Sequence, residues 1–168
     1  MKMESLDKLY EDQLKDLHSA ERQIIEALPR MIKAAGNEQL KQALSDHLDV
    51  TKRQLARLDE IFAKRGKRGQ GKRCRGMEGV LEEGKELLGE EAASEVLDAG
   101  IIAAAQHVEH YEIAGYGTVA AYARLLGDDD AVALLEATLA EEKEADVKLS
   151  DLAESTINVE AETAAGSN

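Results

Sequence analysis

The chain of 168 residues contains no tryptophan and only one cysteine, one proline and one phenylalanine. A single cysteine excludes an intrachain disulfide framework, and the scarcity of proline leaves long segments free to be helical. Aromatic residues make up 3% of the chain, whereas alanine, leucine, glutamate and lysine dominate it. This composition favours helix over sheet. We therefore expect one all-α domain.

Long apolar runs are absent as well. No segment approaches the roughly 20 consecutive apolar residues of a membrane span, and the start, MKMESLDKLYEDQL, lacks the apolar core of a signal peptide. Positive charge is in the minority, since the formal net charge is −13. That charge argues against a protein that binds nucleic acid over its whole surface. We expect a soluble cytoplasmic protein that contacts no membrane.

Four long segments show the periodicity of amphipathic helices. They cover about Glu4–Ala35, Glu38–Lys64, Glu90–Leu126 and a stretch from the aspartates at 128–130 to about Ser155. A basic, glycine-rich connector, GKRGQGKRCRG, follows the second segment, and a short helix is expected in MEGVLEEGKELLG. The polar end, NVEAETAAGSN, is expected to fray.

The lengths of these segments predict a fold. At 1.5 Å per residue the helices span about 40 to 50 Å. Two hairpins joined by one connection that crosses the whole bundle form the ferritin-like arrangement, whereas an up-down-up-down bundle needs no such connector. We predict an all-α, ferritin-like four-helix bundle over residues 1–157, with a short helix in the crossover and a flexible tail at 158–168.

Acidic side chains recur on the apolar faces of three helices. At about 100° per residue, Glu109 and Glu112 lie about 60° apart on the inward side of the third helix. By the same reasoning, Glu21 faces inward on the first helix, and Glu142 and Asp146 face inward on the fourth. Five carboxylates are therefore directed at one interior.

The second helix contributes an imidazole instead of an acid. Its apolar stripe passes through Thr51 and Leu55, which places His47 at the edge of the stripe and Asp49 on the opposite side. We therefore select His47, and not Asp49, as the residue that this helix adds. A hydrogen-bonded histidine at the edge of the core is an equally good interpretation.

Buried carboxylates must be paired, protonated or bound to a cation, and the inward stripes carry no lysine or arginine at the same height. Oxygen ligands with an imidazole suit iron or manganese better than a thiolate-binding metal. The predicted ligands of up to two Fe or Mn ions per chain are Glu21, His47, Glu109, Glu112, Glu142 and Asp146. The alternative is that each glutamate is hydrogen-bonded or reaches solvent.

Four other features have simpler interpretations. The basic segment 64–75 is the one candidate for nucleic-acid contact, but it has no aromatic residue to stack on a base and fits a loop that balances acidic helices. Cys74 has cationic neighbours that would lower a thiol pKa, yet no obvious base accompanies it. Tyr116 fits a core tyrosine with a bonded hydroxyl, and His18 fits a solvated residue.

Several segments resemble one known family. SAERQ, HLDVTKRQLARLDEIF, IAAAQHVEHYEIAGYGT and LAEEKEADVKLSDLA are similar to helices of the YciF/YciE family, bacterial stress-associated ferritin-like proteins of undefined biochemistry. The resemblance covers nearly the whole chain apart from the tail. It implies a homodimer and a di-metal centre like that of rubrerythrin, in which Glu109 and Glu112 match the glutamate pair of the third helix. The second helix departs from this pattern, because Asp49-x-x-Lys52 stands where a Glu-x-x-His pair is expected.

Two functions follow. In the first, the protein is a stress-associated metalloprotein whose ions act on oxygen or peroxide, with an external reductant because the chain lacks a rubredoxin-like cysteine pair. In the second, it is a non-catalytic structural or interaction protein with a vestigial metal site. Iron storage in a closed cage of many subunits is a third and weaker interpretation.

Overall fold

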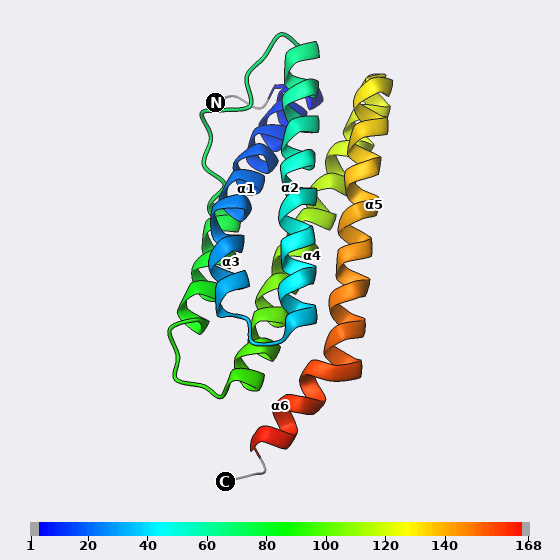
Figure 1. Ribbon diagram of the computed structural model, residues 1–168. Helices are drawn as coiled ribbons and strands as arrows, with labels where there is room; N and C mark the ends of the chain where they lie inside the picture. The colour runs from blue at the N-terminus through cyan, green and yellow to red at the C-terminus, as the bar shows by residue number, and fades with distance from the viewer. Residues whose placement is uncertain (1–3, 166–168) are drawn as a thin grey trace.

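The computed structural model describes residues 4–165, and all the regular structure in that range is helical. The four long helices are α1 (Leu6–Ala34), α2 (Glu38–Lys64), α4 (Ser94–Leu126) and α5 (Asp129–Leu152); α3 (Arg75–Leu87) lies between α2 and α4. Figure 1 shows α1 antiparallel to α2 and α4 antiparallel to α5, with a crossover that runs along the bundle. The prediction of a ferritin-like bundle with a short helix in a long crossover is confirmed.

Local capping sets the ends of the helices. The Ser5 side chain accepts a hydrogen bond from the backbone N–H of Lys8 at the start of α1, and Asn37 accepts one from Gln39 at the start of α2. Gly127 ends α4 in the left-handed conformation, with a φ of 73°. These caps explain why both hairpin turns are short, as the sequence predicts.

The turn between α1 and α2 is fixed by a side chain of α4. Asp98 is buried and accepts hydrogen bonds from the backbone N–H groups of Gly36 and Asn37, at 2.7 and 2.8 Å. Hydrogen bonds to an ionised carboxylate are stronger than those between neutral groups. Asp98 therefore joins the first hairpin to the second at one end of the bundle.

The crossover lies against the outside of α1. Lys72 pairs with Asp12, and Arg65 pairs with Asp7, each at an N–O distance of 2.6 Å. The positive charge of segment 64–75 thus faces acidic side chains of the same chain. This agrees with the interpretation of the segment as a loop that balances the charge of acidic helices.

His18 is buried beneath this crossover. Gly69 lies on its ring, so closely that a Cβ at this position would come within 2.5 Å of the His18 Cδ2 atom. The ring Nε2 lies 2.9 Å from the carboxylate of Asp59, and His18 is only 4% exposed. The expectation of a solvated histidine is wrong, because the crossover packs over this part of α1.

Cys74 is the buried N-cap of α3. Its thiol lies 2.9 Å from the Asp16 carboxylate and 3.0 Å from the Tyr111 hydroxyl. Burial raises the pKa of the Cys74 thiol, and the hydrogen bond to Asp16 adds to the effect. The expectation that cationic neighbours lower this pKa is wrong, because the arginines on either side of Cys74 are exposed.

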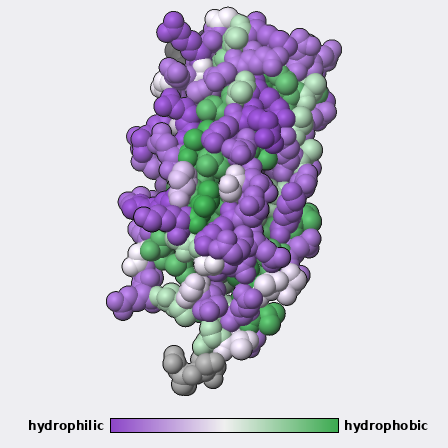
Figure 2. Space-filling view, viewed as in Figure 1, coloured by the Kyte–Doolittle hydropathy of each residue, from purple (hydrophilic) through white to green (hydrophobic). Residues whose placement is uncertain are grey.

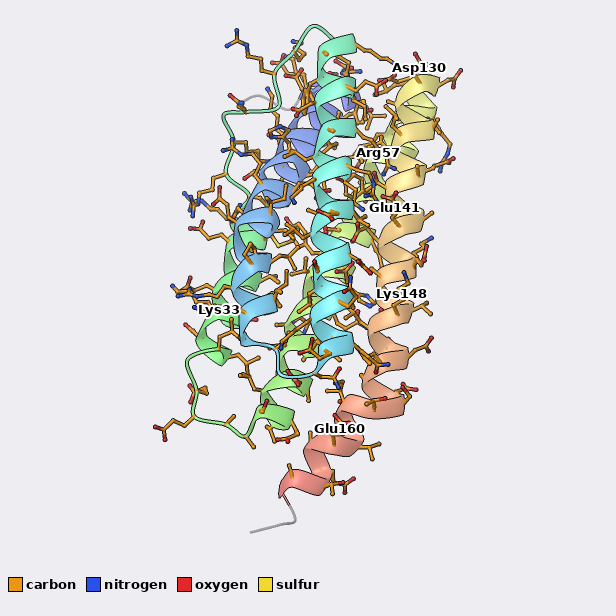
Figure 3. All side chains as sticks on the ribbon, in the orientation of Figure 1. Lys33, Arg57, Asp130, Glu141, Lys148 and Glu160 are labelled. Carbon is orange, nitrogen blue, oxygen red and sulfur yellow. The ribbon has the colours of Figure 1, made fainter. Side chains whose placement is uncertain are left out.

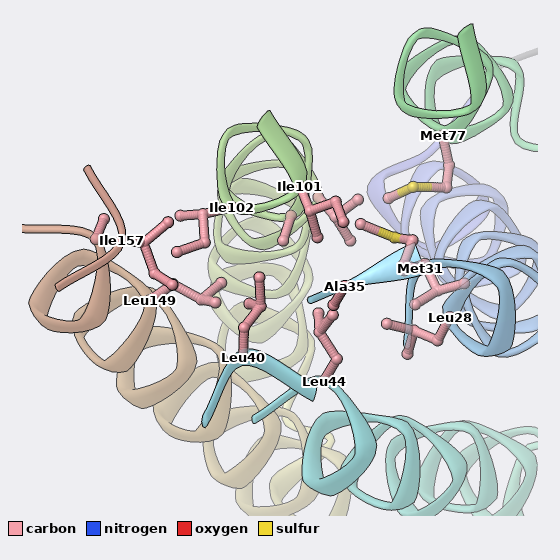
Figure 4. Packing of buried hydrophobic residues seen from close by; sticks show 14 of the residues in the cluster. Leu28, Met31, Ala35, Leu40, Leu44, Met77, Ile101, Ile102, Leu149 and Ile157 are labelled. Carbon is pink, nitrogen blue, oxygen red and sulfur yellow. The ribbon is translucent and has the colours of Figure 1, made fainter. Parts of the chain in front are cut away.

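Two apolar cores fill the two ends of the bundle. The core near the α1–α2 turn includes Leu28, Leu44, Met77, Ile101 and Leu149 (Figure 4). The core at the opposite end includes Leu14, Leu58, Tyr116 and Leu135. Each long helix contributes to both cores, so the residues between its two contributions form a layer in the middle of the bundle.

The fourth long helix continues beyond its expected end. A π-helical turn, η1 (Ala153–Ile157), joins α5 to α6 (Asn158–Ala165), and α6 packs against α4. Figure 1 shows the change of direction at this turn. Residues 158–165 of the expected tail are thus helical, whereas 166–168 and the first three residues of the expected bundle domain lie outside the described residues.

The face of the molecule seen in Figure 2 is mostly hydrophilic, with a narrow hydrophobic strip between α1 and α2. Within residues 4–165, none of the helices has both the length and the apolar character that crossing a bilayer requires. Most of the large apolar side chains lie in the two cores.

Candidate metal centre

A layer of polar side chains separates the two cores. It consists of Glu21 of α1, His47, Thr51 and Gln54 of α2, Glu109 and Glu112 of α4, and Thr138 and Glu142 of α5. All of them except His47 are at most 2% exposed, and the His47 side chain is 11% exposed. Each lies about three or four residues from a core residue on its own helix, so it shares that residue's inward face.

Three residues of this layer converge on one point. His47, Glu109 and Glu142 each offer a ligand atom that lies within 4.8 Å of the other two. The Nε2 atom of His47 is 3.2 Å from Oε1 of Glu109. Ligand atoms about 2.2 Å from one ion can be at most about 4.4 Å apart. Small side-chain movements are therefore enough to place all three atoms around a cation.

The four buried glutamates form two pairs. Glu21 lies within hydrogen-bonding reach of Glu112, and Glu109 lies within reach of Glu142. Ionised carboxylates have no proton to donate. Each pair therefore requires either a shared proton or a cation between its oxygens.

Several polar atoms of the layer have no hydrogen-bond partner within residues 4–165. They are Glu21 Oε2, His47 Nε2, Gln54 Oε1, Glu109 Oε2, both carboxyl oxygens of Glu112, and Glu142 Oε2. Buried polar atoms normally have a partner, and a cation can satisfy oxygen lone pairs and an imidazole nitrogen together. The donor set fits iron or manganese.

Burial shifts the protonation of these groups. It raises the pKa of Glu21 to about 8, although the hydrogen bond from the Tyr116 hydroxyl opposes the shift. Burial, reinforced by neighbouring carboxylates, also raises the pKa of Glu109 and Glu112 well above the usual range. Burial lowers the pKa of His47. A neutral imidazole keeps a lone pair for a metal.

The interior positions of α2 are occupied by neutral side chains. Thr51 and Gln54 are both fully buried, and Gln54 Nε2 donates hydrogen bonds to Glu142 and, at 3.1 Å, to Glu141. Sequence reasoning missed Gln54, although its place three residues after Thr51 marks it as inward-facing. Gln54 orients Glu142 without adding charge to the layer.

Asp49 and Lys52 lie on the outer face of α2 and pair with each other at 3.0 Å, with 69% and 54% of their side chains exposed. Neither residue faces the polar layer, because the helical register turns both outward, as expected for Asp49. The choice of His47 instead of Asp49 agrees with this register.

One arginine reaches the edge of the layer. Arg57 of α2 donates hydrogen bonds to both oxygens of Glu141, at 2.6 and 2.8 Å, and one to Thr138 at 3.2 Å. Figure 3 shows Arg57 and Glu141 between α2 and α5. Arg57 lies beside the inward stripe of α2 and not on it, since its side chain is 23% exposed, and its hydrogen bonds go to Glu141 and not to the paired glutamates.

Asp146 lies apart from the cluster. Its side chain is 28% exposed, and its Oδ1 atom is 3.2 Å from Nε2 of the exposed His110. The structure thus gathers five of the six predicted ligands in one layer and leaves Asp146 at its margin.

Comparison with known proteins places the chain among bacterial relatives. Residues 5–162 match the family described as a domain of unknown function, DUF892. Protein YciF of Escherichia coli K12 is 42% identical over 166 residues, which cover 98% of this chain and 100% of YciF. The crystal structure described as the E. coli stress protein YciF has a TM-score of 0.89, with 93% of this chain and 99% of that chain covered.

Two further structures are similar. YcfI of Rhodopseudomonas palustris, for which a structural role has been suggested, is 46% identical with a TM-score of 0.86, covering 89% of this chain and 95% of that one. A protein from Xanthomonas campestris is 17% identical with a TM-score of 0.73, covering 92% and 94%. At that identity the likeness concerns the fold alone.

Proposed function

This chain belongs to the DUF892 family, as its resemblance to YciF implies, and we propose that it is a stress-associated protein that binds iron or manganese inside its bundle. The observation that supports metal binding is the set of buried acceptor atoms for which residues 4–165 provide no donor. The association with stress is carried over from the E. coli relative, which is described as a stress protein.

Five residues have proposed roles in the metal centre. His47, Glu109 and Glu142 would hold a first ion, because their ligand atoms already converge. Glu21 and Glu112 form the adjacent pair and would provide oxygens for a second ion. Iron or manganese bound there supplies a Lewis acid and a redox centre for oxygen or peroxide.

The surrounding residues prepare this site. The apolar cores above and below the layer exclude bulk water, which strengthens electrostatic interactions between the acids and a cation. The Tyr116 hydroxyl donates to Glu21, and Gln54 donates to Glu142. Both contacts hold a carboxyl group in place while leaving its second oxygen without a partner within the described range.

A second function is supported by the composition of α2. Thr51 and Gln54 are neutral and buried, on a helix that in di-metal carboxylate bundles can contribute a Glu-x-x-His pair. In addition, a structural role has been suggested for the relative YcfI. In this alternative, protons keep the glutamates neutral and the protein is a helical structural or interaction module.

The test is a titration of chelator-treated protein with Mn(II), or with Fe(II) in the absence of oxygen, followed by measurement of bound metal. We expect about one to two ions per chain. The double variant Glu109→Gln, Glu142→Gln should lose them, whereas Glu95→Gln with Glu136→Gln, two exposed acids of the same helices, should bind like the wild type.

A wild-type protein that takes up neither ion would overturn the metal proposal and favour the structural alternative. Sedimentation of the same samples tests the proposed homodimer against a closed cage. Circular dichroism of the variants separates a lost ligand from a lost fold.

A further inference from the structure

A cavity of about 620 Å³ adjoins the polar layer. Its deep wall is apolar and includes Ile24, Leu28 and Met31 of α1 and Val108 of α4. His47 and Glu109, two of the proposed metal ligands, also line it. The cavity therefore leads from the surface to the candidate metal centre.

Residues of α2 and α5 form the mouth. Asp46, Arg53, Glu144 and Lys148 line the cavity and are exposed, and Figure 3 shows Lys148 on α5 below the Glu141 that faces Arg57 of α2. Two of these exposed residues are acidic and two are basic. Such a balanced mouth does not favour a ligand of either charge.

The size and walls of the cavity are those of a site for an organic molecule. Well-packed interiors have few voids larger than a water molecule, and small-molecule sites are usually mostly apolar with volumes of about 300 to 1,000 Å³. An apolar cavity of about 150 Å³ already binds benzene. Oxygen or peroxide alone would leave most of the present cavity unfilled.

The inner end of the cavity limits the kind of polar group that a ligand can carry. His47 Nε2 and Glu109 Oε2 have no hydrogen-bond partner within the described part of the chain. A hydroxyl group can donate to a carboxylate oxygen and accept a hydrogen bond in return. An ionised carboxylate would instead have to lose its hydration inside a mostly apolar cavity, which costs far more than burying a neutral hydroxyl group.

We propose that this cavity binds a neutral aliphatic molecule with one polar head, such as a medium-chain alcohol, with the head at His47 and Glu109. As a binding site the cavity depends only on walls that the chain itself provides. As the substrate site of a metal centre it rests on the proposed function, because any chemistry on the head group requires the ion.

The test is calorimetric titration of n-octanol into chelator-treated protein and into protein loaded with Mn(II), with octanoate as the charged analogue. We expect saturable octanol binding in both forms and, in the chelator-treated protein, octanoate binding at least about tenfold weaker. Ala43→Phe and Ala145→Phe place a ring into the cavity from α2 and α5 and should weaken octanol binding by about tenfold or more. Ala56→Phe and Ala140→Phe, on exposed positions of the same helices, should not.

Paramagnetic relaxation distinguishes the cavity from the metal site. With Mn(II) bound, the carbon beside the hydroxyl group of octanol should relax faster than the terminal methyl group. Octanol binding by a protein that takes up neither Mn(II) nor Fe(II) would support the cavity and overturn the metal centre. The inference about the cavity would be overturned if wild-type protein bound octanol in neither form, or if chelator-treated protein bound octanoate as tightly as octanol. Equal loss of octanol binding in Ala43→Phe and Ala56→Phe would also overturn it, whatever the metal titration gives.

Discussion

Replacement of Glu21 by glutamine should stabilise the metal-free protein at pH 8 but hardly at pH 5. Glu21 is fully buried, its Oε1 atom accepts a hydrogen bond from Tyr116, and its Oε2 atom has no partner within residues 4–165. Glutamine retains an oxygen for Tyr116 and gains an NH₂ group that can donate to the neighbouring Glu112. The substitution therefore removes the ionisable group while preserving the packing.

The expected magnitude follows from the pKa of Glu21, which burial raises from 4.5 to about 8. Between these values the folded protein holds a proton that the unfolded chain has released. The stability due to protonated Glu21 is complete below the unfolded pKa and is lost as the pH rises through the folded pKa. At about 1.4 kcal/mol per pH unit, the loss is about 4 kcal/mol at pH 8 and below about 1 kcal/mol at pH 5.

Urea denaturation followed by circular dichroism, with a chelator present, measures this difference. We expect the free energy of unfolding of Glu21→Gln to exceed that of the wild type by about 2 to 4 kcal/mol at pH 8, with agreement within about 1 kcal/mol at pH 5. Glu26→Gln, an exposed glutamate of the same helix, should match the wild type at both pH values. An effect of Glu21→Gln that is the same at pH 5 and pH 8 would refute the reasoning, because a buried acid must act through its proton.

Two further predictions concern Asp98 and Cys74. Asp98→Ala should lower the free energy of unfolding in urea by about 2 to 3 kcal/mol, because it leaves the backbone N–H groups of Gly36 and Asn37 without their acceptor; Asp98→Asn, which keeps one acceptor oxygen, should lose less. Cys74 should react with a colorimetric thiol reagent at least about a hundredfold more slowly in the folded protein than in urea, because it is fully buried and burial raises the pKa of its thiol. Similar rates in both states would contradict that burial.

The helices could be predicted because each carries a long apolar stripe bounded by glycine, asparagine or aspartate. Their exact ends depended on contacts that the sequence does not display. The third long helix begins at Ser94 instead of the expected Glu90, since the residues before Ser94 are exposed and gain little from helical packing. Conversely, Ile157 is buried in the core near the α1–α2 turn, which helps to hold the helical continuation that the polar composition of the tail concealed.

Helical periodicity predicted which face of its own helix each acid occupies. It did not predict the level along the bundle at which the inward faces of the four helices meet. Asp146 lies one turn beyond Glu142 on the same helix, yet it pairs with His110 at the margin. In the same way, the buried amide of Gln54 could be assigned to Glu142 only after α2 and α5 were placed side by side. Pairs across helices depend on packing, and a single periodic pattern contains no information about the partner helix.

The buried glutamates are best explained by a requirement other than folding. Above the pH at which the unfolded chain releases their protons, the raised pKa values of Glu21, Glu109 and Glu112 make the metal-free fold less stable. Leucine side chains in this layer would join the two apolar cores without that effect. Residues that lower the stability of the fold in this way are typical of functional sites. A cation between the paired carboxyl groups would offset the loss, so metal binding and the stability of the layer should rise and fall together.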